Sequence, residues 1–179
     1  MAFYNLAVAL KNKGVPIDGV GLQCHFSVGE VDSVKLAKTV QRFAEAGLKC
    51  IITELDMGIP STTSENLEEQ ARNYRVVTDI MLKNDNCPSM VIWGIKDNDS
   101  WRSASNPLLY NSGMQPKPAW RAVRSALRHH TLVNSIIPHT VQYKPLNTNV
   151  YTIDGRHANA SSLKPGIYIK EGKKFIVRP

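Results

Sequence analysis

Residues 48–57 read LKCIITELDM, and this stretch decides the fold. Its Cys-Ile-Ile run is continuous rather than alternating, which is typical of a parallel strand that is buried on both faces. Glu54 and Asp56 stand two residues apart at the end of the run, so both side chains lie on the same face of the strand. The stretch therefore predicts a buried parallel strand that ends in two carboxylates.

Similar strands are predicted on both sides of this one. IDGVGLQCHF at residues 17–26 and PSMVIWGI at residues 88–95 are short apolar runs bounded by turn residues. Helical spacing of apolar residues predicts helices over residues 2–13, 32–46, 65–83 and 118–130. Strands that alternate with helices imply βαβ units and a parallel sheet, either as a barrel segment or as a doubly wound sheet.

Polar and aromatic residues gather at the carboxyl ends of all three predicted strands, where parallel barrels carry their chemistry. The strand ends supply, in chain order, Gln23 and His25, then Glu54 and Asp56, then Trp93 with Trp101 close behind. A carboxylate pair, polar neighbours and flat tryptophan surfaces that can stack on sugar rings suit cleavage of a glycosidic bond.

Each of these residues also has a purely structural interpretation. Glu54 could form a salt bridge at a strand end, His25 could be a hydrogen-bonded core histidine, and Trp93 could be a core residue. Asp97 and Asp99 read as turn and capping residues. The repetition of polar groups at three strand ends favours a site over any of these single interpretations.

Composition and motifs argue against several classes of protein. The net charge is +7, but most of the excess lies in residues 132–179, which hold 7 Lys/Arg against 2 Asp/Glu. The sequence lacks the basic stripe with interleaved aromatics that would indicate a nucleic-acid partner. No apolar run approaches the roughly 18 residues of a membrane helix, and the N-terminus is a poor signal peptide. The cysteines Cys24, Cys50 and Cys87 lack metal-site spacing, and no phosphate-binding glycine loop occurs. Neither a metal nor a cofactor is therefore expected.

The combined motifs closely resemble the last part of the family 10 glycoside hydrolases, mainly endo-1,4-β-xylanases. The segments that carry the resemblance are GVPIDGVGLQCHF, IITELDM, VIWGIKDNDSWR and PLLYNSGMQPKPAW, between about residue 3 and residue 127. The resemblance implies an α/β chain that forms part of a (β/α)8 TIM barrel, namely units 6–8. Residues 1–130 would form this portion, residues 131–149 a linker, and residues 150–179 a small β tail.

The resemblance also implies a role for each residue of the predicted site. Glu54 stands at the family's nucleophile, His25 at the histidine that hydrogen-bonds it, and Asp56 at the aspartate that orients the histidine. Four further residues would line the sugar-binding cleft: Gln23, Trp93, Trp101 and Arg102. The implied partner is xylan or a xylo-oligosaccharide, and no cofactor takes part.

One departure from the family pattern leaves two hypotheses open. The family's general acid/base is a glutamate that follows an asparagine at the end of strand 4, and no such motif occurs in this sequence. The chain could supply the nucleophile half of a retaining xylanase, with the N-terminal barrel half as its partner. Alternatively, it is a non-catalytic fragment or a xylan-binding remnant.

The tail has a resemblance of its own. NVYTIDGRHANASSLKPGIYIKEGKKFIVRP, residues 149–179, predicts short strands with turns at Gly166 and Gly172. It is similar to the C-terminal secretion modules of Bacteroidetes. This likeness implies that the parent protein is exported and is extracellular or bound to the cell surface, whereas the alternative is an arbitrary β tail.

Overall fold

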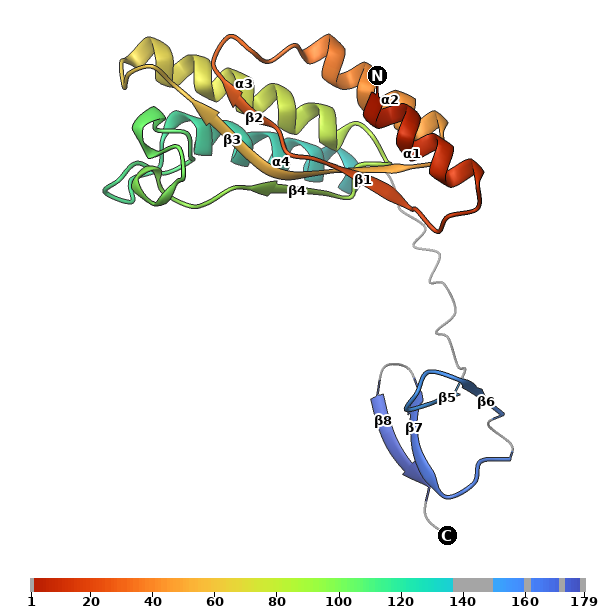
Figure 1. The fold of residues 1–179 in the computed structure, drawn as a ribbon. Coiled ribbons are helices and arrows are strands. Elements are labelled where there is room, and N and C mark those ends of the chain that lie inside the picture. The colour runs from red at the N-terminus through yellow and green to blue at the C-terminus, as the bar shows by residue number, and fades with distance from the viewer. Residues whose placement is uncertain (1, 137–149, 160–161, 171–172, 178–179) are drawn as a thin grey trace. The chain divides into compact units, whose positions relative to one another are not determined.

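The computed structural model describes residues 2–136, 150–159, 162–170 and 173–177, and the chain divides into two compact units. The first unit comprises residues 1–137 and the second comprises residues 138–179. Figure 1 shows helices and parallel strands in the first unit and a small set of strands in the second. The fold is thus mixed α/β, with the βαβ units confined to the first unit.

The first unit alternates helices and strands in the predicted order. Its elements are α1 (Ala2–Asn12), β1 (Gly19–Leu22), β2 (His25–Ser27), α2 (Ser33–Glu45), β3 (Lys49–Gly58), α3 (Ser64–Leu82), β4 (Ser89–Ile92), the 3-10 turns η1 (Asp97–Asp99) and η2 (Ser103–Ser105), and α4 (Pro118–Ile136). Asp32 caps α2 by accepting a hydrogen bond from Lys35 N–H at 2.8 Å. Helix α4 continues to Ile136, so part of the expected linker is helical, and residues 137–149 lie outside the described residues.

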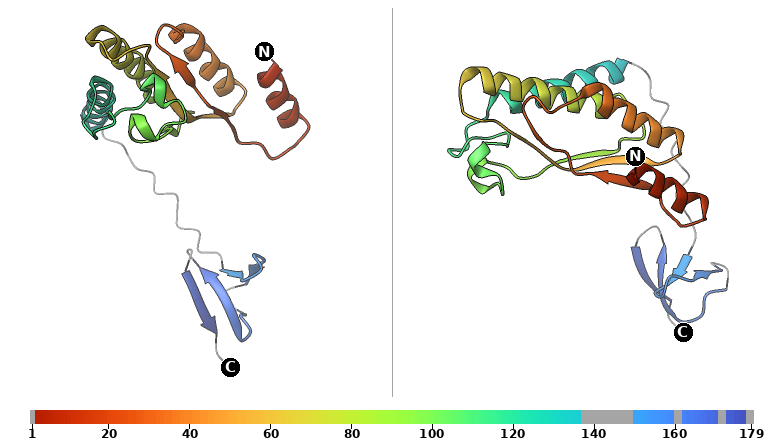
Figure 2. Two further views of the ribbon diagram at one scale, coloured as in Figure 1. Left: turned by 60° about the vertical axis from the view of Figure 1, so that its left-hand side comes forward. Right: turned by 45° about the horizontal axis from the view of Figure 1, so that its top comes forward.

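Strand β3 is the centre of a parallel sheet. Strand β1 pairs with the first half of β3 and β2 with its second half, while β4 pairs along the opposite side. Figure 2 shows the helices arranged in an arc over one face of these strands. Because β1 and β2 share one side of β3, the sheet is only three strands wide, and the described residues contain no further strand beside β1, β2 or β4.

The single strand predicted over residues 17–26 is wrong, since the structure divides it into β1 and β2. Cys24, between them, has a φ of 63°, a left-handed conformation that a regular strand does not accommodate. The interruption lies opposite residues 53–55 of β3, directly beside the carboxylates. The chain thus turns at the point where the site begins.

The core lies between β3 and the helices. Ile52, Leu55 and Met57 are fully buried against Tyr74 and Val77 of α3, and α4 adds two further buried residues, Ala119 and Val123. A second cluster joins α1, α2 and the start of β3 through Ala7, Val20, Val40, Phe43, Leu48 and Cys50. These clusters anchor β3 on its helix-covered face.

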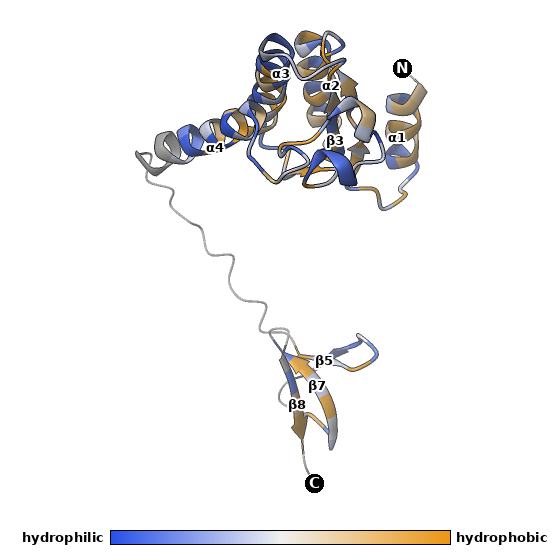
Figure 3. Ribbon diagram, turned by 90° about the vertical axis from the view of Figure 1, so that its left-hand side faces the viewer, coloured by the Kyte–Doolittle hydropathy of each residue, from blue (hydrophilic) through white to orange (hydrophobic). Residues whose placement is uncertain are grey.

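The second unit is a small antiparallel sheet. It consists of β5 (Val150–Thr152), β6 (His157–Ala158), β7 (Gly166–Lys170) and β8 (Lys173–Val177), in the order β6-β5-β7-β8. Figure 3 shows hydrophobic residues along β7 and β8. Val150 and Tyr168 are buried, whereas Ile153 and Ile176 are exposed, so this unit has a small core of its own.

Candidate active site

A bulge in β3 directs the first carboxylate. The register with β1 pairs Gly19 with Lys49, whereas the register with β2 pairs His25 with Asp56, so β3 holds one additional residue between these pairings. The pairing with β4 also shifts between Ile52 and Leu55. Since Ile52 and Leu55 both face the helices, the extra residue places Thr53 and Glu54 between two inward-facing positions. Bulges of this kind commonly aim a side chain next to a functional site.

His25 bridges the two carboxylates of β3. Its Nδ1 lies 2.9 Å from Asp56 Oδ2, and its Nε2 lies 3.2 Å from Glu54 Oε2. Gln23 Nε2 donates to the other oxygen of Glu54 at 3.4 Å. The structure therefore brings together the four polar residues that the sequence places at the ends of the first two predicted strands.

Asp56 is a buried acceptor with several donors. Its side chain is fully buried, and it accepts from Trp101 Nε1 at 2.8 Å and from Arg102 Nη1 at 2.7 Å. Arg102 also donates to Phe26 O at 2.9 Å and to Ser27 Oγ at 3.1 Å. An ionised carboxylate without partners would be costly at this depth, so these donors stabilise its negative charge.

The contact with the Asp56 carboxylate determines which ring nitrogen of His25 carries a hydrogen. A carboxylate only accepts hydrogen bonds, so the Nδ1 that faces Asp56 carries a hydrogen. A neutral imidazole with its hydrogen on Nδ1 presents a lone pair on Nε2. The contact with Glu54 is then a hydrogen bond only when one more proton is shared, either on Nε2 or on Glu54. Asp56, His25 and Glu54 thus form a relay of hydrogen-bonding groups across the ends of β2 and β3.

Two tryptophans stand at the same edge of the sheet. Trp101 is 66% exposed although its indole N–H is held by Asp56, and its ring meets the His25 ring edge-on at 5.0 Å. Trp93 follows β4, is 46% exposed, and is tied to β3 by its backbone N–H, which donates to Leu55 O at 2.9 Å. The core interpretation of Trp93 is therefore wrong, and both rings offer flat surfaces to a ligand.

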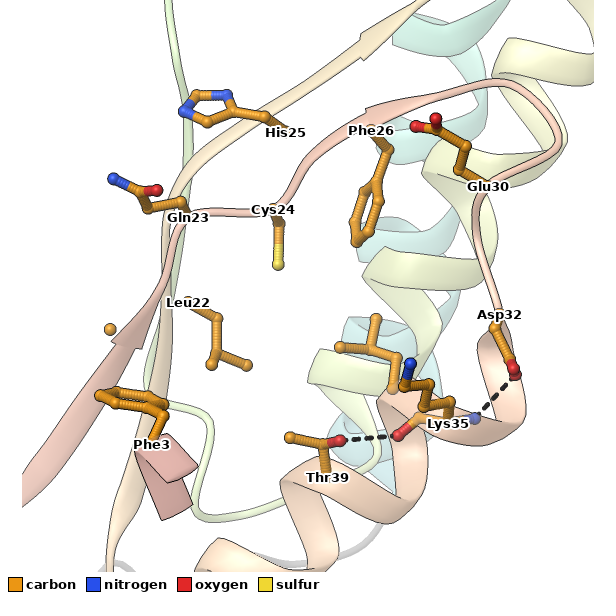
Figure 4. A pocket seen from close by; sticks show the side chains of 12 residues that line it. Phe3, Leu22, Gln23, Cys24, His25, Phe26, Glu30, Asp32, Lys35 and Thr39 are labelled. Carbon is orange, nitrogen blue, oxygen red and sulfur yellow. Dashed lines mark hydrogen bonds between the residues drawn. The ribbon is translucent and has the colours of Figure 1, made fainter. Parts of the chain in front are cut away.

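A hollow of about 820 Å³ lies beside the site, and Gln23 and His25 are among the residues that line it. It is bounded by α1, α2 and the segment that joins β1 to β2. Figure 4 shows Cys24 and Phe26 pointing into this hollow, whereas His25 points away from it. Cys24 therefore belongs to the apolar side of the segment, and the catalytic candidates belong to the other.

Some of the residues that shape the site are not evident from the sequence. Arg102 is predicted only as a cleft residue, yet it is the ion-pair partner of Asp56. Asp97 and Lys117 form a second, buried ion pair in the loop that carries Trp101. A charged residue such as Lys117 within the mainly apolar and turn-forming PLLYNSGMQPKPAW is the only signal that the sequence offers for this pair. Within the described ranges, no group of three or more His, Cys, Asp or Glu side chains is arranged to hold a metal ion.

Comparisons with known proteins place this arrangement among glycoside hydrolases. Residues 1–126 match the family model described as Glycosyl hydrolase family 10. The bifunctional endo-1,4-beta-xylanase XylA of Ruminococcus flavefaciens is 40% identical over 121 residues, which cover 67% of this chain and 12% of that protein. Endo-1,4-beta-xylanase B of Thermotoga neapolitana is 34% identical over 131 residues, covering 69% of this chain and 38% of that protein.

Solved structures agree with the sequence relatives. Xylanase 10B from Thermotoga petrophila RKU-1, in complex with xylobiose, is 33% identical to this chain with a TM-score of 0.68. The match covers 71% of this chain and 41% of that one. The chain thus spans less than half the length of each of these relatives.

The thiol of Cys24 offers a test of the local geometry. Burial raises the pKa of Cys24 from 9.0 to about 11, which leaves roughly a hundredfold less thiolate at pH 8. We expect Cys24 in the native chain to react with iodoacetamide far more slowly than the same residue in urea, as measured by mass spectrometry of its peptide. Equal rates in the two conditions would show that the segment between β1 and β2 is open to solvent.

Proposed function

This chain belongs to glycosyl hydrolase family 10, and from that premise we propose that it supplies the nucleophile side of a retaining xylan-hydrolysing site. The observation that carries the proposal is the Glu54–His25–Asp56 relay at the carboxyl ends of adjacent parallel strands. The relatives bear the name xylanase, and one of them is solved with xylobiose. Xylan or a xylo-oligosaccharide is therefore the proposed substrate.

Geometry distinguishes the roles of the two carboxylates. Asp56 has no exposed surface, and both of its oxygens are occupied by donors from His25, Trp101 and Arg102. Glu54 is 24% exposed and remains reachable by a ligand. Glu54 is therefore the nucleophile that attacks the anomeric carbon and forms the covalent glycosyl-enzyme, while Asp56 orients His25.

The neighbours of Glu54 support this role. The amide of Gln23 donates to Oε1, which stabilises negative charge on the attacking group. His25 Nε2 lies 3.2 Å from Glu54 Oε2 and so holds this carboxylate in place from the other side. Trp101, with its indole nitrogen fixed and its ring exposed, provides a stacking surface for a xylose ring next to Glu54.

The general acid must come from elsewhere in this proposal. A retaining site needs a second carboxyl group about 5–5.5 Å from the nucleophile, and Asp56 cannot serve because its oxygens are already engaged. The unpaired outer sides of β1, β2 and β4 within the described sheet suit further parallel strands. We therefore propose that a polypeptide with the remaining strands of a (β/α)8 barrel supplies the acid.

The second candidate function is xylan binding without hydrolysis. It is favoured by the absence of an Asn-Glu pair after an apolar strand in this sequence. Assistance from a general acid is worth roughly 10²–10⁴-fold in rate, so the chain alone would turn over plain xylan very poorly. The relay and the exposed tryptophans would then serve only to hold the sugar.

Replacing Glu54 by alanine separates these roles. In a barrel completed with the N-terminal half of a family 10 relative, we expect Glu54→Ala to lower xylan hydrolysis by at least about 10³-fold, because no glycosyl-enzyme can form. Added azide should restore turnover of an activated aryl xyloside, because from the vacated space it can attack the anomeric carbon, displace the aryl group and give a xylosyl azide. The matched control is Glu68→Ala, on the exposed surface of α3, which should leave the rate unchanged.

Undiminished hydrolysis by Glu54→Ala in the completed barrel would refute the assignment of the nucleophile. A completed barrel that binds xylobiose but hydrolyses nothing, even with Glu54 intact, would instead favour the binding function.

We also propose that the second unit is a secretion module that directs the parent protein out of the cell. The proposal is supported by the likeness of residues 149–179 to such modules and by the compact antiparallel arrangement of β5–β8, distinct from the α/β unit. Its excess of Lys/Arg over Asp/Glu also sets it apart from residues 1–131. An extracellular or cell-surface location follows from this proposal.

Export can be tested with a reporter. Residues 138–179 fused behind a periplasm-directed fluorescent protein, in a Bacteroidetes host with a type IX route, should carry the reporter to the medium or the cell surface. The same fusion without residues 173–179, which include β8, should remain in the periplasm. Equal retention of both fusions would contradict the proposed secretion role.

A further inference from the structure

The loop between β4 and α4 carries three residues of the site, Trp93, Trp101 and Arg102, but little regular structure. Over this fully described segment it contains the short turns η1 and η2 and two isolated bridges, Lys96–Tyr110 and Tyr110–Pro116. Trp101 and Arg102 nevertheless meet Asp56 at 2.8 and 2.7 Å. Such contacts require that the loop be fixed by interactions other than those of a helix or a strand.

A buried ion pair closes this loop. Lys117 Nζ lies 3.2 and 3.1 Å from the two oxygens of Asp97, and the two side chains are only 5% and 3% exposed. Lys117 also donates to Asn106 O at 2.7 Å, and Asp97 accepts from Leu108 N–H at 2.8 Å. The start, the middle and the end of the loop are thus tied at one point.

The middle of the loop is in turn joined to the end of β3. Gln70 of α3 donates to Asn106 O at 2.9 Å and to Met57 O at 2.6 Å. Two backbone hydrogen bonds run beside this link, from Met57 N–H to Pro107 O at 3.0 Å and from Ile59 N–H to Ser105 O at 2.7 Å. Met57 directly follows Asp56, so a displacement of the loop would shift the backbone next to the buried carboxylate.

The ion pair is a costly way to fill this space. Burial lowers the pKa of Lys117, and the charge of Asp97 opposes that shift. Apolar residues of similar volume often stabilise a fold as well as a buried ion pair does, or better. Unlike apolar residues, the pair fixes the relative positions of specific groups, because the Lys117 ammonium group donates to Asp97 and to Asn106 O at the same time.

We propose that the buried Asp97–Lys117 pair is a positioning device that holds Trp101 and Arg102 on Asp56. Through Asp56 it keeps the His25 ring in line with Glu54. Neither Asp97 nor Lys117 belongs to the relay itself, and each acts through the loop. The inference rests on the proposed function only for the identity of the sugar, since the positions of Trp101 and His25 can be measured without it.

The test compares Lys117→Met with the unchanged full chain by NMR. We expect the Trp101 indole N–H to exchange about tenfold faster or more, because its hydrogen bond to a charged acceptor loosens. The ¹⁵N shifts of the His25 ring should move toward those of a free imidazole, while far-UV circular dichroism stays the same. The matched control is Lys96→Met, which removes a partly exposed lysine 3.6 Å from Asp99 in the same loop and should change neither signal.

A double variant guards against misfolding of the single one. Asp97→Asn with Lys117→Met removes both charges at similar volume, so it should fold, yet Asn106 O still loses its lysine donor. We expect the same faster indole exchange in this variant. If it keeps the wild-type exchange rate and His25 shifts, the pair only stabilises the fold and the proposal is wrong, whatever happens to the melting temperature.

Titration with xylobiose separates this inference from the proposed function. Indole exchange could be faster in the variants while xylobiose leaves the Trp101 and His25 signals of the wild-type chain unchanged. That result would support the positioning device and count against sugar binding at this site. If the wild-type signals respond to xylobiose but the variant signals are identical to those of the wild type, sugar binding at this site is supported and the positioning device is refuted.

Discussion

The negative charge of Asp56, fully buried at the end of β3, is the constraint on which the site depends. A charge at this depth must be matched by donors, and the chain supplies them from β2 through His25 and from the loop before α4 through Trp101 and Arg102. The hydrogen bonds that stabilise the Asp56 carboxylate therefore also fix the positions of the His25 ring, the Trp101 indole and the Arg102 guanidinium group. Glu54 receives its place from the same arrangement, since His25 spans the two carboxylates.

The sequence predicts the alternation of helices and strands and the edge at which the site forms, because both follow from short-range patterns. Apolar periodicity locates α2 and α3 to within a few residues, a continuous apolar run locates β3, and the strand-end rule singles out Gln23, His25 and Glu54. The bulge in β3 and the left-handed Cys24 are not predicted, since each depends on how neighbouring strands pair. The Asp97–Lys117 pair also escapes prediction, because its members are separated by a loop whose path no periodicity describes.

The proposed division of the chemistry between this chain and a second polypeptide follows from the architecture. Helices cover one face of the sheet, and β3 has neighbours on both sides, yet no further strand pairs with β1, β2 or β4 in the described part of the chain. Glu54, His25 and Asp56 lie wholly within this three-strand width, and Asp56, the other carboxyl group of this cluster, has both oxygens engaged by donors. In the proposed mechanism the attacking carboxylate is therefore local to this sheet, whereas the acid that protonates the leaving group as the glycosyl-enzyme forms is not.

The coupling free energy between Asp56 and Arg102 tests the central claim most directly. A double-mutant cycle of Asp56→Ala and Arg102→Met, read from urea unfolding of the full chain, should give a coupling of about 1.5–3 kcal/mol, as expected for a hydrogen bond between charged groups in a buried cluster. The exposed Arg72–Glu69 pair on α3 provides the reference, with an expected coupling below about 1 kcal/mol. Effects of Asp56→Ala and Arg102→Met that add to within about 0.5 kcal/mol would contradict the account.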